Sequence, residues 1–362
     1  MSTIELKRIT KTFGAFTAVK EVDLSVAAGE VVCLLGPSGC GKTTTLRMIA
    51  GLEQTTAGDV IVAGKRMNDL PPERRDIAMV FQFYALYPAL SVGGNMAFPL
   101  HHERLGNEEI ARRVKKVARL LHLDGILERL PGQISEGEKQ RVAVARAIIR
   151  DPNCFLFDEP LSRLDVELRQ SMRGQIKAVL SGLSKATVIV THDQLEALTM
   201  ADRIAIMRDG VIEQISTPHE VFARPANVFV ASFIGTPQMN LMEVDFKGMQ
   251  GKKANLDFNT KSIAIDVDPA VKSLKPSRVT VGIRPRALAP KDAAGADTIA
   301  AAAELIEPMG AETLIHARGE AGHEIRVVVQ RDVRIRIGET LHLRPDPRQT
   351  HIFDETGRAV RT

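Results

Sequence analysis

Apolar positions in the first part of the chain follow two patterns that take turns along the sequence, continuous apolar runs and helical spacing. Continuous apolar runs at residues 31–35, 154–157 and 187–191 predict strands that are buried on both faces, as in a parallel sheet. Helical spacing of apolar residues predicts three helices, at about 42–50, at 107–122 and, after a loop, within 133–150. Shorter strands are predicted in the first 30 residues and in a hairpin at 204–212. Strands that alternate with helices predict an α/β fold with a mainly parallel sheet.

The pattern changes near Gly235-Thr236-Pro237, beyond which helical spacing disappears. Short strands with alternating apolar residues are predicted at 279–283, 325–329, 333–337 and 341–343. The Ala-rich stretch 287–303 is predicted as a loop. Many short strands indicate a small β-barrel or sandwich. We therefore predict an α/β domain at residues 1–235, with a helical subdomain at about 88–152, and an all-β domain at 236–362.

Composition excludes several classes of protein. The 362 residues are 44% hydrophobic and 25% charged, which excludes a disordered chain and gives each domain enough apolar residues for a core. The net charge of +4 is too small to indicate a nucleic-acid partner. The charged N-terminus lacks the apolar stretch of a signal peptide, and no apolar run approaches the roughly 18 residues of a membrane span. Three widely spaced cysteines indicate neither a disulfide framework nor a zinc site, and are typical of a reducing cytosol.

The strongest motif is the sequence GPSGCGKT at residues 36–43, which follows a predicted strand and precedes a predicted helix. It matches the phosphate-binding pattern G-x-x-x-x-G-K-[ST]. Glycines allow backbone N–H groups to surround phosphate oxygens at the start of a helix, Lys42 reaches the β- and γ-phosphates, and the Thr43 hydroxyl binds Mg²⁺. We expect nucleotide contacts from Gly36, Pro37, Ser38, Gly39, Cys40, Gly41, Lys42, Thr43 and Thr44.

Two carboxylates end the apolar strand at 154–157, and a histidine ends the strand at 187–191. Asp158 is a candidate for the Mg²⁺ shell, and Glu159 is a candidate to orient or deprotonate the attacking water. His192 is placed to contact a γ-phosphate. A strand end with acids or a single histidine is common in proteins, so these residues gain their meaning from the phosphate loop.

The order and spacing of five motifs resemble the nucleotide-binding subunits of ABC transporters across residues 1–235. After the phosphate loop come segments similar to the Q-loop, the LSGGQ signature, the acidic strand end, the D-loop and the switch histidine. They are MVFQFYALYP at 79–88, ISEGEKQR at 134–141, DEP at 158–160, LSRLD at 161–165 and His192. Phe13 stands at the aromatic position that stacks on adenine, with Phe16 as its rival. The sequences RMIAGLE at 47–53, FIGTPQMN at 233–240 and GIRP at 282–285, and the β-rich C-terminal part, resemble the ATPases of bacterial carbohydrate importers of the maltose and glycerol-3-phosphate type. This resemblance implies that the C-terminal part is a regulatory domain with an oligonucleotide-binding-like barrel.

The resemblance implies an ATP- and Mg²⁺-dependent ATPase that works as a homodimer with two ATP molecules between the subunits. It implies catalytic roles for Glu159, His192 and Gln82, and Mg²⁺ ligation by Thr43, Gln82 and Asp158. Ser135 and Gly137 would contact the γ-phosphate bound by the other subunit. Two transmembrane permease subunits would dock near Gln82 to Pro88, and an extracytoplasmic solute-binding protein would complete the system. The expected location is peripheral, on the cytoplasmic face of the bacterial inner membrane, with no nucleic acid bound and a sugar, polyol or glycerol-phosphate-like solute.

Three charged residues of the chain depart from the family pattern. Glu136 and Glu138 stand in the signature, where two carboxylates near a phosphate would repel it. We expect both side chains to point away, to solvent or to Lys139 and Arg141. Arg163 replaces the Asn that is usual in the D-loop.

Two other functions compete with an importer subunit. One is a soluble ABC ATPase of DNA repair or translation, although such proteins usually carry two cassettes or a coiled-coil insertion. The other is a regulatory protein in which ATP switches the C-terminal barrel. Co-purification with hydrophobic permease subunits separates an importer from the soluble ATPases.

Overall fold

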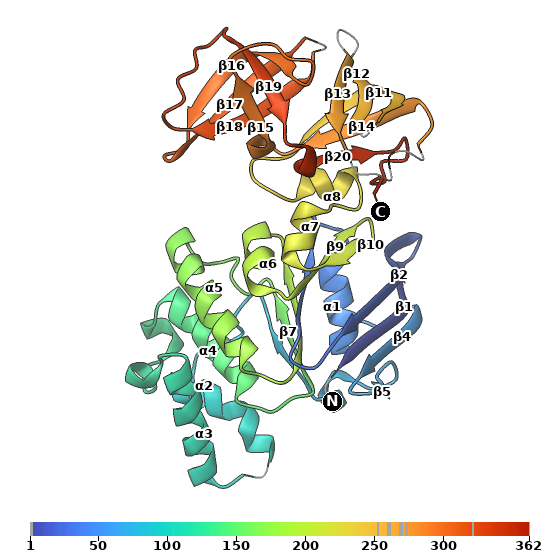
Figure 1. The fold of residues 1–362 in the computed structure, drawn as a ribbon. Coiled ribbons are helices and arrows are strands. Elements are labelled where there is room, and N and C mark those ends of the chain that lie inside the picture. Colours follow the sequence, from blue (N-terminus) through green and yellow to red (C-terminus); the bar gives the residue numbers. More distant parts are fainter. Residues whose placement is uncertain are drawn as a thin grey trace. The chain divides into compact units, whose positions relative to one another are not determined.

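The chain forms two compact units in the computed structural model, Met1–Pro218 and His219–Thr362 (Figure 1). The structure describes residues 3–103, 105–251, 253–258, 262–267, 271, 274–320 and 322–361. Contacts divide the chain at residue 218, whereas the sequence pattern places the boundary at 235. The helices between these points are α7 (Pro218–Ala223) and α8 (Val228–Phe233), and α8 packs on strands of the second unit.

A six-stranded sheet forms the centre of the first unit. Its strand order is β10-β9-β3-β8-β7-β6, and all neighbours are parallel except β9 and β10, which form the predicted hairpin. The strands are β3 (Val31–Leu35), β6 (Ile77–Val80), β7 (Cys154–Asp158), β8 (Ala186–Thr191), β9 (Arg203–Arg208) and β10 (Val211–Ser216). Every residue of β3, β7 and β8 is buried, as their continuous apolar runs predict.

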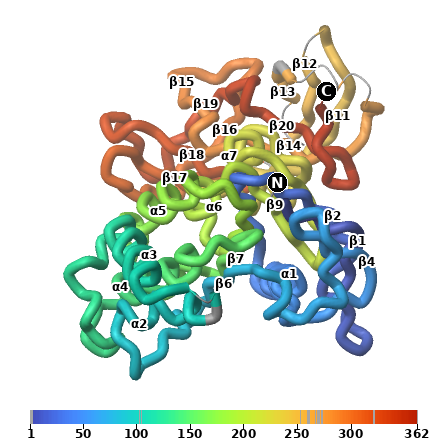
Figure 2. Tube along the Cα trace, turned by 90° about the horizontal axis from the view of Figure 1, so that it is seen from below, coloured from blue at the N-terminus to red at the C-terminus, as the bar shows by residue number. Residues whose placement is uncertain are grey.

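An antiparallel sheet and the α-helices α1 to α6 complete the described part of the first unit (Figures 1 and 2). The sheet has the order β2-β1-β4-β5, from β1 (Ile4–Phe13), β2 (Phe16–Val26), β4 (Ala57–Val62) and β5 (Lys65–Arg66). The helices are α1 (Lys42–Ala50), α2 (Val92–Ala97), α3 (Asn107–Leu120), α4 (Glu136–Ile148), α5 (Val166–Ser181) and α6 (Gln194–Met200), which confirms the three predicted helices. Figure 2 shows α2, α3 and α4 grouped on one side of this unit, and α1 with the antiparallel sheet on the other.

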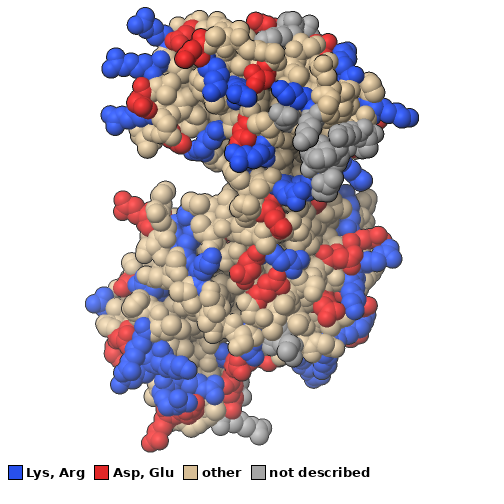
Figure 3. All heavy atoms as spheres, in the orientation of Figure 1, with Lys and Arg blue, Asp and Glu red and all other residues tan. Residues whose placement is uncertain are grey.

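Basic residues of α3 lie on its outer face, opposite its buried apolar residues. Ile110 and Val114 are buried, whereas Arg112, Lys115 and Lys116 are exposed. Figure 3 shows Lys and Arg side chains gathered over this helix. Within the described residues, no helix has the length and apolar character that a membrane span needs.

Two five-stranded antiparallel sheets form the second unit. Their orders are β13-β12-β11-β14-β20 and β15-β19-β16-β17-β18. The strands are β11 (Asn240–Gln250), β12 (Lys253–Asp257), β13 (Ser262–Asp266), β14 (Ser277–Ile283), β15 (Leu288–Lys291), β16 (Ile299–Pro308), β17 (Glu312–Gly319), β18 (Glu324–Gln330), β19 (Thr340–Pro345) and β20 (Thr350–Phe353). Both sheets contribute to one hydrophobic core, with Phe246 and Val281 from the first and Ile315 and Val327 from the second. This confirms the predicted all-β, barrel-like second domain.

The Asn240 side chain joins the two sheets of the second unit. Its Nδ2 donates to the carbonyl of Arg326 at 2.8 Å, and the Arg326 amide donates back to Oδ1 at 2.7 Å. Arg326 lies in β18, the edge strand of its sheet, so the buried side chain supplies the pair of hydrogen bonds that a neighbouring strand would give.

Two sequence predictions in the second unit are wrong. Residues 333–337 form no strand, because Val333 and Ile337 are exposed and only Ile335 packs on the core. The stretch 287–303 is not one loop, since it contains β15 and the start of β16. In β16 the inward positions include Ala301 and Ala303, and a run of alanines carries no contrast between apolar and polar positions that would reveal a strand.

Candidate active site

The loops that follow β3, β6, β7 and β8 carry most of the predicted site residues. These four strands are parallel and adjacent in the order β3-β8-β7-β6, so their carboxyl ends meet at one edge of the sheet. The phosphate loop follows β3, and Gln82 follows β6. Asp158 and Glu159 come at the end of β7, and His192 directly follows β8. Segments that are distant in sequence therefore converge on a single site.

Two glycines of the phosphate loop are required by close packing of the backbone. A Cβ atom at Gly36 would lie 2.3 Å from the carbonyl oxygen of Met207 in β9. Gly41, with φ of +103°, would place a Cβ atom 2.6 Å from the carbonyl oxygen of Ala18 in β2. The loop is thus fixed between β9 and β2 before it enters α1 at Lys42.

Lys42 is a buried cation within the phosphate loop, with 6% of its surface exposed. Its Nζ donates to the carbonyl oxygens of Gly36 at 2.8 Å and Pro37 at 2.9 Å, and lies 3.7 Å from the Cys40 sulfur. A buried ammonium group held by neutral carbonyls beside a helix N-terminus favours an anion. This arrangement fits the phosphates of a nucleotide.

Asp158 and Thr43 bring two oxygen ligands together beside the phosphate loop. The Thr43 hydroxyl donates to Asp158 Oδ1 at 3.4 Å. Burial, reinforced by the charge of Glu159, raises the pKa of Asp158 above its ordinary value. A buried carboxylate of this kind is stabilised by a cation, and carboxylate and hydroxyl oxygens are the ligands that Mg²⁺ prefers. The residues therefore fit the predicted Mg²⁺ site.

The Glu159 carboxylate is held between Gln82 and His192. Gln82 Nε2 donates to Oε2 at 3.0 Å, and His192 Nδ1 lies 3.1 Å from Oε1. The Glu159 backbone has φ of +46°, a left-handed conformation that is costly for a residue other than glycine and is typical of functional sites. Its amide donates to the Val190 carbonyl in β8 at 2.9 Å. The three catalytic candidates are thus in direct contact.

Residues that the sequence analysis did not single out hold the loop of His192. Asp193 caps α6 by accepting from the amides of Leu195 and Glu196, and it pairs with Arg169 of α5 at 3.3 Å. The buried Thr191 hydroxyl donates to Glu196 at 2.7 Å. Asp193 at the start of a helix was a readable capping signal in the sequence.

The signature segment starts α4, with Ser135 as the N-cap. Glu136 pairs with Lys139 at 2.6 Å, as expected. The expectation for Glu138 is wrong, because its carboxylate turns back and accepts from the Ser135 amide at 2.7 Å and from the Ser135 hydroxyl at 2.9 Å. The physical reason is a capping box, which the pattern S-x-x-E announces in the sequence. These hydrogen bonds also lower the pKa of Glu138.

Phe13 and Phe16 face each other across the turn between β1 and β2, and both rings are exposed. The Lys11 ammonium lies 4.7 Å from the centre of the Phe13 ring and pairs with Glu53 at 2.6 Å. The strand β2, which follows this turn, passes the phosphate loop at Ala18. Both rings are open for stacking, and the preference for Phe13 stays a prediction.

The segment from Gln82 to Pro88 presents aromatic side chains at the surface. Phe83 is 63% exposed and Tyr87 is 42% exposed, and the Tyr87 ring lies 4.4 Å from that of Phe98. Arg146 of α4 holds this segment by donating to the carbonyls of Tyr84 and Ala85. Exposed aromatic groups of this kind mark binding surfaces for other proteins.

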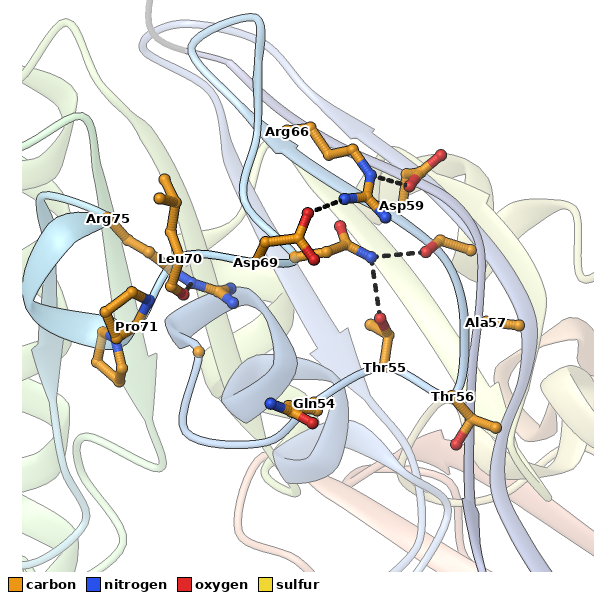
Figure 4. A pocket seen from close by; sticks show the side chains of 14 residues that line it. Gln54, Thr55, Thr56, Ala57, Asp59, Arg66, Asp69, Leu70, Pro71 and Arg75 are labelled. Atoms are coloured by element: carbon orange, nitrogen blue, oxygen red, sulfur yellow. Dashed lines mark hydrogen bonds and ion pairs between the residues drawn. The ribbon is translucent and has the colours of Figure 1, made fainter.

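A polar cavity of about 810 Å³ lies elsewhere on the first unit, near the end of α1 and the antiparallel sheet (Figure 4). Arg66 is paired there with Asp59 and Asp69. Arg75 donates to backbone carbonyls at the end of α1 and at Leu70. These charged groups thus serve the fold, and the cavity is lined by none of the residues predicted for the site.

The parallel sheet, the phosphate loop and the carboxylates at the strand ends define a P-loop nucleotide-binding ATPase. Family models match at two places, "ABC transporter" at residues 19–162 and "TOBE domain" at residues 281–353. The chain is 46% identical to the sn-glycerol-3-phosphate import ATP-binding protein UgpC of Chromohalobacter salexigens, over 99% of this chain and 96% of the relative. It is 43% identical to the sulfoquinovosyl glycerol transport ATP-binding protein SmoE of Agrobacterium fabrum, over 98% of each.

Solved structures agree with these sequence relatives. A dimer of the ATP-binding cassette MJ0796 bound to ADP and Pi matches with a TM-score of 0.53 and 33% identity, and the match covers 59% of this chain and 98% of that one. The chain belongs to the family of ABC transporter ATP-binding proteins, and it is an ATP-binding ATPase of that family.

Proposed function

We propose that this chain is the ATP-hydrolysing subunit of a bacterial ABC importer for a sugar, polyol or glycerol-phosphate-like solute. The observation that carries the hydrolytic part is the contact of Glu159 with both Gln82 and His192, beside the phosphate loop. The solute class is supported by relatives whose names specify import of sn-glycerol-3-phosphate and transport of sulfoquinovosyl glycerol. The solute itself would be selected by an extracytoplasmic binding protein and by the permeases.

The residues divide the hydrolytic work between binding and proton transfer. Lys42 and the backbone amides of residues 36–44 bind the phosphates, while an aromatic ring, Phe13 in our preference, stacks on the adenine. Glu159 orients a water molecule and accepts its proton as the water oxygen attacks the γ-phosphorus, and the bond to the bridging oxygen of ADP breaks. Gln82 and His192 hold the Glu159 carboxylate in the orientation that this step requires.

Three side chains are suited to hold Mg²⁺, namely Thr43, Asp158 and Gln82. The ion would neutralise charge on the β- and γ-phosphates. Asp158 would hold it as a carboxylate, because a nearby cation opposes the effect of burial on its pKa.

The site is completed by a second copy of the chain. In the homodimer the start of α4, with Ser135 and Gly137, faces the γ-phosphate bound by the partner, so that a helix N-terminus stabilises the anion from the opposite side. ATP closes the dimer and hydrolysis reopens it. Two permease subunits dock at the aromatic surface near Gln82 to Pro88, which places the protein peripherally on the cytoplasmic face of the inner membrane.

Co-purification from membranes tests the importer function against a soluble ABC ATPase. The chain is tagged in its native host and purified after solubilisation of the membranes with a mild detergent. We expect two hydrophobic permease subunits to co-purify with it. Substituting Tyr87 and Phe98 by Ser should abolish this capture while ATP hydrolysis by the isolated chain persists. Recovery of ribosomes or DNA-repair proteins in place of permeases would contradict the proposal.

A further inference from the structure

Arg163 and Phe83 form a contact that the catalytic scheme above does not use. The guanidinium carbon of Arg163 lies 3.9 Å from the centre of the Phe83 ring. Phe83 is otherwise largely exposed, at 63% of its surface. A guanidinium group stacked on an aromatic face is attracted by the ring quadrupole and covers one side of the ring. The contact therefore fixes an aromatic side chain that would otherwise move freely in solvent.

The contact lies directly beside the hydrolytic residues. Phe83 follows Gln82, whose Nε2 donates to Glu159 Oε2 at 3.0 Å. Arg163 follows Ser162, whose hydroxyl donates to the Glu159 carbonyl at 3.1 Å and lies 3.5 Å from Gln82 Nε2. Two consecutive residues of one loop are thus joined to two consecutive residues of the turn that leaves Glu159. Two points of attachment prevent the first loop from rotating about either one.

The charge of Arg163 also acts on Glu136. Glu136, in the first turn of α4, has a lowered pKa because of its hydrogen bond from Lys139, and the charge of Arg163 adds to that effect. Glu136 and Arg163, two of the three charged residues that depart from the family pattern, therefore attract each other. Arg163 therefore stacks on the loop that carries Gln82 and acts on the start of the signature helix through its charge alone.

We propose that Arg163 is a positioning residue for ATP hydrolysis, which stacks on Phe83 and thereby keeps the Gln82 amide against Glu159. The proposal rests on the proposed hydrolytic function of Glu159. In this proposal the D-loop residue Arg163 contacts the Phe83 ring of its own subunit. Phe83 lies in the proposed permease-docking surface and directly follows Gln82 in the chain. A movement of the Phe83 ring on docking would therefore also move Gln82.

A fluorescent reporter tests the contact without using activity. The chain contains no tryptophan, so Phe83→Trp introduces a single indole at this position. We expect the emission of this variant to shift to longer wavelength, and its quenching by acrylamide to increase, when Arg163→Ala is added. Arg112→Ala, which removes an exposed arginine of α3, is the matched control and should change neither signal. Identical spectra with and without Arg163 would overturn the proposal.

Kinetics test the positioning role. We expect Arg163→Ala and Phe83→Leu each to lower kcat about tenfold, with the Kd for ATP within about twofold of the parent, because the lost contact acts on orientation rather than on binding. The double variant should be no slower than either single variant, since both remove the same contact. Phe83→Tyr retains the aromatic face and should restore most of the rate.

The Mg²⁺ requirement gives a further readout. If Gln82 is a Mg²⁺ ligand, its side chain should bind the ion more weakly when Arg163 no longer fixes the loop. We therefore expect Arg163→Ala to need an about threefold or more higher Mg²⁺ concentration for half-maximal quenching of a bound fluorescent nucleotide. Additive effects of the two single variants, or kcat of Arg163→Ala within about twofold of the parent, would overturn the proposal. If Glu159→Gln is inactive while Arg163→Ala is unaffected, only the positioning role fails. If Glu159→Gln retains turnover, the hydrolytic function itself fails.

Discussion

Glu159 Oε1 lies 3.1 Å from His192 Nδ1, across the gap between the carboxyl ends of β7 and β8. The same carboxylate accepts from Gln82 at its other oxygen. Each oxygen of the carboxylate thus has its own side-chain neighbour, and the two neighbours together fix its rotation. A general base must point at the water molecule whose proton it takes, and the two neighbours hold the Glu159 carboxylate in one fixed direction for this purpose.

Replacing His192 should affect turnover far more than nucleotide binding. We expect His192→Ala to lower kcat by about 10- to 100-fold, since the Glu159 carboxylate loses one of the two side chains that fix its orientation. The Kd for ATP should stay within about threefold, because the phosphate loop is untouched. His101→Ala, at an exposed position of the first unit, serves as the control. Equal losses in binding and in turnover would place His192 in nucleotide binding alone.

Lys42→Ala should weaken nucleotide binding itself. The substitution removes a buried positive charge from the centre of the phosphate loop, and we expect the Kd for ATP to rise at least about tenfold. Fluorescent-nucleotide titration measures this, with circular dichroism to show that the chain stays folded. The control is Lys65→Ala, on the exposed strand β5. Unchanged affinity would show that the loop is not the phosphate cradle.

Glu138→Gln should strengthen ATP-dependent dimerisation. The Glu138 carboxylate lies 2.9 Å from the Ser135 hydroxyl, at the helix end proposed to face the partner's γ-phosphate. A glutamine preserves the capping box and removes the negative charge, so we expect the ATP concentration for half-maximal dimer formation to fall about threefold or more. Analytical ultracentrifugation provides the measurement. Glu136→Gln, whose carboxylate is paired with Lys139, is the comparison and should have the smaller effect.

Asn240→Ala should destabilise the second unit without touching the ATPase chemistry. It removes two hydrogen bonds and leaves the amide and carbonyl of Arg326 without them, at a cost of about 2–4 kcal/mol in the free energy of unfolding. Asn255→Ala, at a partly exposed position of β12, should cost about 0.5 kcal/mol or less. Denaturant unfolding of the full chain followed by circular dichroism checks both. A loss as small as that of Asn255→Ala would show that this side chain does not join the sheets.

The elements and residues that the sequence revealed are those with local signals. Buried strands gave continuous apolar runs, and the phosphate loop gave a motif of fixed spacing. The Ala-rich strand β16 gave no signal, because inward and outward positions are equally apolar. The alternation of apolar and polar residues at 333–337 was misleading, because Val333 and Ile337 are exposed and the segment forms no strand.

The geometry around Glu159 depends on tertiary contacts that no local pattern encodes. Its contacts with Gln82 and His192 result from the order of the parallel strands, and no local pattern indicates its left-handed backbone. The stacking of Arg163 on Phe83 likewise joins loops that are distant in sequence. The capping box of Glu138, in contrast, was readable from the spacing of Ser135 and Glu138 alone.

The central claim is that Glu159 is the base of an ATPase whose site is completed by a second copy of the chain. The most direct measurement combines turnover and association state for Glu159→Gln with ATP and Mg²⁺. The amide keeps the shape and loses the basic oxygen, so we expect turnover to fall at least about 100-fold while ATP binding persists. Size-exclusion chromatography should then show a stable dimer that carries ATP. Turnover within about threefold of the parent chain, or a variant that stays monomeric at saturating ATP, would contradict the account.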